Sequence, residues 1–128
     1  MKVILDTNFL VYLAENKIFD ELDSKGYQLL MPRLVDVELE KIQCSDAKGS
    51  DKEAALLAQT IMKRWTQLKK AKYLDIDGDN ADNAIFEYAK SKKGKVAVAT
   101  LDAELKERLK KEQIPVIIIR QKKYIERE

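Results

Sequence analysis

The amino-acid sequence predicts an α/β fold in three layers, with a central parallel sheet of about five strands between two layers of helices. Short runs of β-branched and aliphatic residues alternate along the chain with longer segments of helical period. Strands that are separated by helices pair in parallel through right-handed crossovers. The chain has 128 residues, of which 45% are hydrophobic, so we expect one core and a single domain spanning residues 1–128.

The predicted strands are short apolar runs that end at polar or turn-forming residues. The first run stops at Asp6, and the fourth begins directly after Gly94, which closes the helix before it. The five predicted strands are Lys2–Leu5, Tyr27–Met31, Tyr73–Ile76, Lys95–Ala99 and Val116–Ile119.

The predicted helices lie between these strands and carry capping residues at their ends. Thr7 and Asn8 can cap the first helix, and Gly26 follows the second, where a left-handed residue is expected. Pro32 suits the first turn of the third, and Ser50-x-x-Glu53 resembles a capping box for the fourth. The helices run from 7 towards 14, over 18–25, from 32 to about 42, from 50 to about 68, over 80–91 and from about 101 to 112.

The long fourth helix carries an apolar stripe of helical period, which we expect to face the core. Its only tryptophan lies on this stripe, so a core position is favoured over a base-stacking role. The stripe consists of Ala54, Leu57, Ala58, Ile61, Trp65 and Leu68.

Four acidic residues lie where predicted strands lead into helices: Asp6, Glu38, Asp82 and Asp102. Asp6 ends the first strand, and Asp102 lies three residues beyond the end of the fourth. The carboxyl ends of parallel strands form one edge of a sheet, where ligands bind in such folds. We therefore expect Asp6 and Asp102 to face each other at this edge.

The other two acids lie on the apolar stripes of their helices. Glu38 is in series with Val35 and Leu39, and Asp82 is in series with Ile85. Burying grouped carboxylates costs several kcal/mol unless a cation shares the site. The alternatives are helix caps for Asp82 and Asp102 and a buried ion pair for Glu38.

The composition limits which cation this could be. The chain has no histidine and a single cysteine, Cys44, so neither a disulfide nor a zinc site of the usual kind is available. Oxygen ligands favour Mg²⁺ or Mn²⁺. No segment resembles a signal peptide or a membrane span, so we expect a cytoplasmic protein without a membrane partner.

Charge is distributed unevenly along the chain. Residues 1–88 carry 12 basic and 16 acidic side chains, whereas residues 89–128 carry 12 basic and 6 acidic ones. The downstream excess of base suits a polyanion, and a solvated helix face is the alternative.

Four short motifs together resemble the PIN-domain ribonucleases. They are Val3-Ile4-Leu5-Asp6-Thr7-Asn8, Pro32-x-x-Val35-x-x-Glu38-Leu39, Ala81-Asp82-Asn83-Ala84-Ile85 and Ala99-Thr100-Leu101-Asp102. The resemblance implies a metal-dependent endoribonuclease in which Asp6, Glu38, Asp82 and Asp102 hold one or two Mg²⁺ or Mn²⁺ ions. A water would then attack a phosphodiester of single-stranded RNA.

The resemblance also implies supporting residues and partners. Thr7, Asn8 and Thr100 match small polar positions beside the acids, where they would orient metal-bound water. Asp79 is expected to cap its helix rather than to join the acids. Relatives of this family often form homodimers, so a homodimer is a further expectation.

The C-terminal stretch Ile114–Arg120, followed by Lys122-Lys123-Tyr124-Ile125-Glu126, resembles the PIN nuclease of the eukaryotic small-subunit processome. This resemblance implies maturation of precursor ribosomal RNA, together with ribosome-assembly factors, as the leading role. A VapC-type toxin silenced by an antitoxin is one alternative, and a non-catalytic RNA-binding assembly factor is another. The basic residues expected to contact RNA are Lys92, Lys93, Arg120, Lys122 and Lys123.

Overall fold

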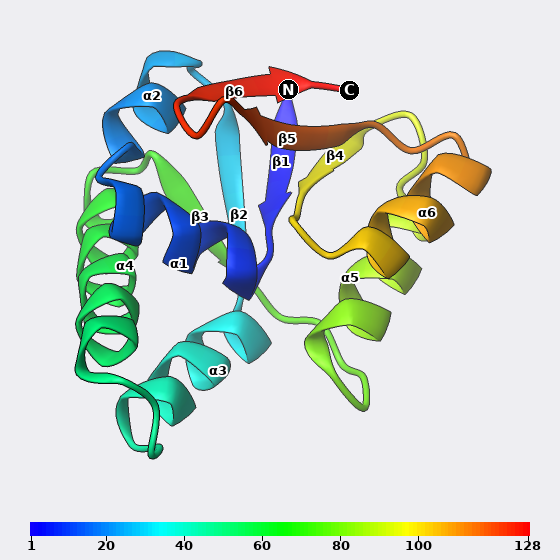
Figure 1. Cartoon of the computed structure of the whole chain (residues 1–128). Coiled ribbons are helices and arrows are strands. Elements are labelled where there is room, and N and C mark those ends of the chain that lie inside the picture. Colours follow the sequence, from blue (N-terminus) through cyan, green and yellow to red (C-terminus); the bar gives the residue numbers. More distant parts are fainter.

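The computed structural model describes residues 1–128, which form a six-stranded sheet with helices on either side (Figure 1). The strand order is β3-β2-β1-β4-β5-β6, and all neighbours pair in parallel except β5 and β6. The predicted α/β architecture with a parallel sheet is confirmed. The strands are β1 Lys2–Leu5, β2 Gln28–Pro32, β3 Ala71–Leu74, β4 Val96–Ala99, β5 Val116–Arg120 and β6 Tyr124–Arg127.

Five of the six helices form two groups, as the reversal of strand order at β1 requires. Figure 1 shows α1, α3 and α4 together on one side of β1, and α5 with α6 on the other. None of these helices is long and apolar enough to span a membrane. The helices are α1 Thr7–Asn16, α2 Phe19–Ser24, α3 Arg33–Gln43, α4 Gly49–Gln67, α5 Ala81–Ser91 and α6 Ala103–Lys111.

The sixth strand, β6, was not predicted. It pairs with β5 in antiparallel fashion through a turn in which Gln121 and Lys122 have left-handed backbones, with φ of 52° and 62°. Sequence signals for such a turn are Gly and Asn, which are absent here. The strand also buries only Ile125, so it lacks the alternation that marks a strand.

Three predicted helix caps are wrong, whereas the predicted left-handed Gly26, with φ of +67°, is confirmed. Asp6 rather than Thr7 or Asn8 caps α1. The N-cap of α4 is Lys48, which forms no side-chain cap bond, so the Ser50 capping box does not form. Asn80 rather than Asp79 caps α5.

The core centres on β1, whose Val3, Ile4 and Leu5 are completely buried, so both faces of this central strand are covered. Trp65 of α4 joins the core and packs edge to face on Phe19 of α2, with ring centroids 5.7 Å apart, as its position on the apolar stripe predicted. The buried face of α4 differs in part from the predicted stripe. Leu57 and Leu68 are 41% and 49% exposed, and the buried residues of α4 are Ala54, Ala55, Ala58, Met62 and Trp65.

We predict that Ile125→Ala destabilises the chain by about 2–5 kcal/mol, because it removes a fully buried side chain that anchors β6. Chemical denaturation followed by circular dichroism measures this loss. Tyr124→Ala is the matched control, since Tyr124 is 48% exposed on the same strand and its loss should cost well under half as much. Equal costs would mean that β6 is not packed as described.

Candidate active site

The candidate site lies at the carboxyl edge of the sheet, where β1 and β4 end side by side. Leu5 and Ala99 are the last paired residues of these two strands. The backbone N–H of Asp6 donates to the carbonyl of Ala99 at 3.0 Å, which fixes the chain just beyond the pair. Asp6 and Thr100 are therefore held next to each other, although they are 94 residues apart in the sequence.

The carboxylate of Asp6 is only 2% exposed and is fixed at both oxygens. Its Oδ1 accepts from the backbone N–H of Thr7 at 2.8 Å, which caps α1. Its Oδ2 accepts from the hydroxyl of Thr100 at 2.6 Å, and Thr100 is itself completely buried. Since a carboxylate oxygen can accept more than one bond, each oxygen retains capacity for a cation.

Glu38 reaches the same place from the middle of α3. Its Oε1 accepts from the hydroxyl of Thr7 at 2.7 Å, so Thr7 joins α1 to α3 beside the buried acid. None of the ion pairs in the structure includes Glu38, so the alternative of an ion pair is wrong. Its charge is left without a basic partner.

Asp82 and Asp102 lie at the starts of two helices, with different local roles. Asp102 caps α6 and accepts from the backbone N–H of Leu105 at 2.7 Å. Its own N–H donates to the hydroxyl of Thr100 at 3.1 Å, which ties it to Asp6. Asp82 is the second residue of α5 and is not its cap. One carboxylate oxygen of Asp102 therefore accepts a helix-capping hydrogen bond, whereas neither oxygen of Asp82 does.

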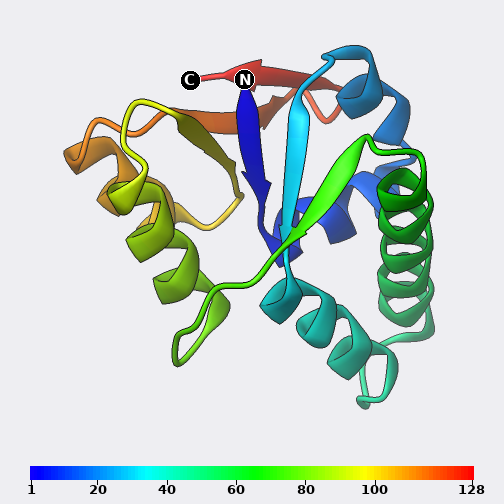
Figure 2. The same ribbon diagram turned by 180° about the vertical axis from the view of Figure 1, so that it is seen from behind.

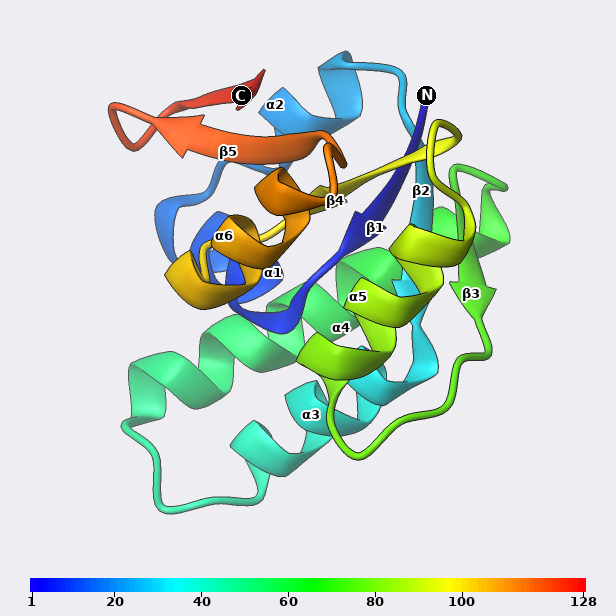
Figure 3. The same ribbon diagram turned by 90° about the vertical axis from the view of Figure 1, so that its right-hand side faces the viewer.

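Two hollows at this edge meet at Asp82. The first has a volume of about 340 Å³, and Asp6, Thr7, Asn8, Glu38, Lys41, Ile42 and Asp82 line it. The second, about 240 Å³, is lined by Asn80, Asp82, Asn83, Asp102, Glu104, Leu105 and Arg108. Figure 3 shows the end of β1 and the start of α5 in this part of the molecule. All four predicted acids border this pair of hollows, whereas Asp79 lines neither of them.

Two of the acids, Asp6 and Asp82, have a raised pKa. Burial, which is the largest cause, together with the charges of Asp82 and Glu38 raises the pKa of Asp6 to about 6, against the lowering effect of the Thr100 hydrogen bond. Burial also raises the pKa of Asp82, and the charges of Asp102, Glu38 and Glu104 add to this effect. The positive ends of α1, α5 and α6 point towards this edge and offset part of the repulsion.

The donor set fits a hard divalent cation. It consists of carboxylate oxygens with no paired base, which is the ligand chemistry of Mg²⁺ and Mn²⁺. No three of the acids are close enough together to surround one ion as they stand. Asp6 is fixed and buried, whereas Glu38, Asp82 and Asp102 are only partly buried. A cation among the four acids would offset their mutual repulsion.

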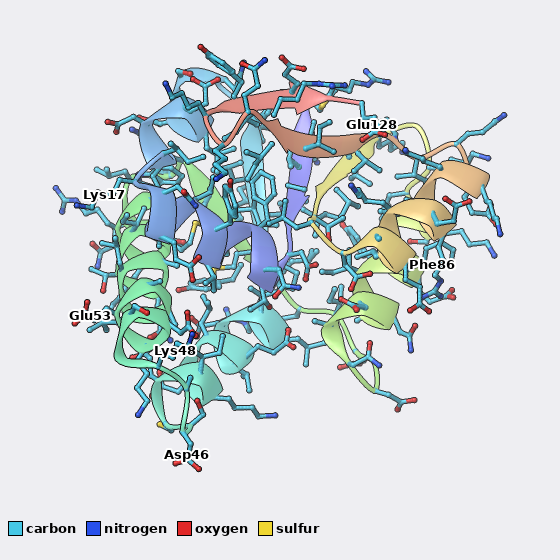
Figure 4. All side chains as sticks on the ribbon, viewed as in Figure 1. Lys17, Asp46, Lys48, Glu53, Phe86 and Glu128 are labelled. Carbon is cyan, nitrogen blue, oxygen red and sulfur yellow. The ribbon has the colours of Figure 1, made fainter.

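Sequence reasoning did not identify two basic residues in these hollows. Lys41 lies one turn after Glu38 on α3, and Arg108 lies one turn after Glu104 on α6. Lys41 is three residues after Glu38 and so lies on the same face of α3, which means that the helical spacing could have predicted its place in the site. The guanidinium of Arg108 donates a hydrogen bond to Oδ1 of Asn83 at 2.9 Å and lies over the ring of Phe86. Figure 4 shows Phe86 on the side of the molecule formed by α5 and α6.

The basic residues that were expected to contact RNA lie away from these hollows. Lys92 and Lys93 follow α5 and lead into the amino end of β4. Lys122 and Lys123 belong to the turn between β5 and β6, which Figures 1 and 3 show at the end of the molecule opposite the start of α5. Arg120 pairs with Glu126 at 2.6 Å. The structure does not bring these five residues to the acids.

A glycine allows close packing beside the turn that carries Asp82. Gly78 lies in the loop before α5, and a Cβ at this position would come within 2.9 Å of the Cβ of Ala84 and 3.3 Å of its backbone nitrogen. Any larger residue at position 78 therefore has to move the first turn of α5, which carries Asp82. Asp82, in this same turn, is the residue that lines both hollows.

Comparisons with known proteins identify the family. A family described as PIN like domain matches residues 3–122, so the chain belongs to this family. Ribonuclease VapC4 of Methanocaldococcus jannaschii is 40% identical over 132 residues, which cover 98% of this chain and 95% of the relative. The solved structure of the PIN domain endonuclease Utp24 is 26% identical with a TM-score of 0.74, and the match covers 99% of this chain and 92% of the other. The predicted enzyme class, a PIN-type endoribonuclease, is confirmed.

We predict that Asp6 makes the chain less stable as the pH rises from about 4 to about 6 in the absence of divalent cations. In this window the unfolded chain is ionised at Asp6 while the folded chain holds its proton, because burial raises the folded pKa from 3.8 to about 6. The free energy of unfolding should fall by up to about 3 kcal/mol from this residue alone. Urea unfolding of wild type and Asp6→Asn in EDTA, across this range, isolates the contribution of Asp6. Parallel curves for the two chains would contradict the burial argument.

Proposed function

We propose that the chain is a divalent-metal-dependent endoribonuclease of the VapC toxin type, which hydrolyses phosphodiester bonds in single-stranded RNA and is silenced by an antitoxin. The observation that carries this proposal is the 40% identity with ribonuclease VapC4 along nearly the whole chain. The four unpaired carboxylates around two adjoining hollows supply the chemistry that such an activity needs.

The proposed roles depend on how each acid is held. Asp6 is the fixed ligand, since hydrogen bonds hold both of its oxygens. Together with it, Glu38, Asp82 and Asp102 would hold one or two Mg²⁺ or Mn²⁺ ions. Such ions would lower the pKa of water and stabilise the attacking and leaving oxygens. Thr7 orients Glu38, and Asn8 lines the same hollow, where its amide can bond to water.

Two basic residues suit the RNA backbone on either side of the cleaved bond. Lys41 lines the hollow that contains Asp6 and Glu38, and Arg108 lines the hollow that contains Asp102. Asp82 lines both hollows, so an RNA strand that crosses both of them would meet a basic side chain in each, Lys41 in one and Arg108 in the other. Arginine and lysine at these places bind phosphate by charge and by hydrogen bonds.

Maturation of precursor ribosomal RNA, with ribosome-assembly factors as partners, is the second candidate. The observation that favours it is the likeness to the PIN domain endonuclease Utp24 over 99% of this chain. Its sequence identity, 26%, is lower than that of the VapC relative, so the toxin role is preferred. Both roles use the same acids and differ only in the RNA that is cleaved and in the protein partner.

We predict that the purified chain cleaves a fluorescent single-stranded RNA with Mn²⁺ or Mg²⁺, and that both EDTA and Asp6→Asn abolish cleavage. Asn retains the size of Asp and the acceptor for the Thr7 N–H, while it removes the buried negative charge that would bind the cation. Gel analysis of the RNA fragments measures the activity. Binding without cleavage by the wild-type chain would favour a non-catalytic RNA-binding assembly factor instead.

A graded variant separates loss of the site from loss of the fold. Thr100→Val keeps the shape of a buried side chain but removes its hydrogen bond to Asp6, so cleavage should fall about 10- to 100-fold. Thr60→Val is the matched control, because Thr60 donates to Leu56 on the exposed side of α4 and should leave cleavage unchanged. An equal change in cleavage for the two variants would contradict a role of Thr100 in the activity.

We predict that expression of the chain in a bacterial host arrests growth, whereas Asp6→Asn does not. A toxin cleaves host RNA and depends on its metal-binding acids, and co-expression of a cognate antitoxin should restore growth. Optical density after induction measures the arrest. Normal growth, together with active cleavage in vitro, would contradict the toxin role and favour maturation of precursor ribosomal RNA.

A further inference from the structure

A second charged surface lies at the opposite edge of the sheet from the acids. Lys2 begins β1, Lys69 precedes β3, and Lys72 is the second residue of β3. These lysines line a hollow of about 100 Å³, and no carboxylate lines it. Its remaining lining residues are Gln28, Leu29, Leu30, Lys70 and Ala71.

The hollow opens beside β2 and β3, on the part of the sheet face over which no helix lies. Tyr73 lines a separate hollow with residues of α3 and α4, so its neighbour Lys72 points to the opposite face. Lys72 pairs in register with Leu30, and Lys2 with Gln28, which places both lysines on this face. Figure 2 shows β2 and β3 from this side without a helix over them.

Three of the lysines have no opposite charge to balance them. Lys70 pairs with both oxygens of Asp23 at 3.1 Å. Lys2, Lys69 and Lys72 are exposed and form no ion pair. Grouped like charges repel one another, so a bound anion would be favoured there.

The positive surface continues along the amino edge of the sheet. β4 lies next to β1, and Lys2 pairs in register with Val96. Lys92, Lys93 and Lys95 precede Val96, and none of them forms an ion pair. Unpaired lysines are therefore present from β3 across β1 to β4, which suits a chain of phosphates better than a single ion.

We infer that the hollow formed by Lys2, Lys69 and Lys72 binds phosphates of the RNA backbone away from the cleaved bond. The choice of RNA as the polyanion rests on the proposed function. Lys2 and Asp6 are four residues apart on one extended segment, or about 13 Å, and this corresponds to about four nucleotides of a stacked strand. Because β1 itself is buried, an RNA that contacts both the lysines and the acids passes over β2 and β3 rather than along β1.

The test measures RNA binding, so that it does not depend on cleavage. The full chain carries Asp6→Asn to prevent cutting, and fluorescence anisotropy with a labelled single-stranded RNA gives Kd at several KCl concentrations. The triple variant Lys2→Glu, Lys69→Glu, Lys72→Glu should weaken binding about tenfold or more. The slope of log K against log salt should become less steep by about 2, since three phosphate contacts are lost.

The matched control reverses the same amount of charge elsewhere. Lys48→Glu, Lys52→Glu, Lys111→Glu changes three lysines that form no ion pair and line none of these hollows, and Figure 4 shows Lys48 near the α3 and α4 connection. It should weaken binding much less and keep the salt slope. Equal losses in the two triple variants, or no loss in either, would overturn the inference.

A milder variant keeps the test decisive if the triple reversal fails to fold. Lys2→Gln with Lys72→Gln removes charge without reversing it and should reduce the salt slope by about 1.4. An unchanged slope in this folded variant would overturn the inference. Active cleavage by the wild type with unaltered binding by the variants would reject the lysine site alone. Weakened binding by the variants without any wild-type cleavage would reject the proposed function alone.

Discussion

The site depends on the burial of one carboxylate, Asp6, without a base to pair with it. Burial of an unpaired charge is unfavourable, and the fold tolerates it through two hydrogen bonds and the positive end of α1. The bond from Thr100 joins Asp6 to the end of β4, and the bond from Thr7 to Glu38 joins α1 to α3. Helices α1 and α3 and the end of β4 are thus connected through residues next to this carboxylate.

Parallel pairing explains why so few residues are needed to build the site. Asp6 and Asp102 follow the ends of β1 and β4, which lie side by side in the sheet, so their positions depend on backbone pairing rather than on a special loop. Thr100 uses one hydroxyl twice, as a donor to Asp6 and as an acceptor from the N–H of Asp102. Glu38 and Asp82 are added by helices, and the second of them depends on the close packing at Gly78.

The apolar pattern of the sequence was enough to predict most of the fold, whereas contacts made by single residues were hard to predict. Five strands and the acid edge were predictable, because buried runs and the ends of parallel strands obey general rules. The strand β6 was not, since Ile125 is its only buried residue. The charge excess near the C-terminus did not lead to the acid edge, since Arg120 is paired with Glu126 and Lys122 and Lys123 lie in a distant turn. The role in ribosomal RNA maturation rested on tail residues, and the relative at 40% identity favours the toxin type instead.

The distance in sequence between Asp6 and Thr100 also has a consequence for biosynthesis. The strand before Thr100 inserts directly beside β1, so the acids cannot assemble until most of the chain has left the ribosome. A nascent chain that ends before β4 contains Asp6, Glu38 and Asp82 but lacks both the Thr100 hydroxyl and Asp102. Domains tend to fold as units during synthesis, and contacts this far apart form late. A nuclease organised in this way lacks a complete site until its last quarter emerges from the ribosome.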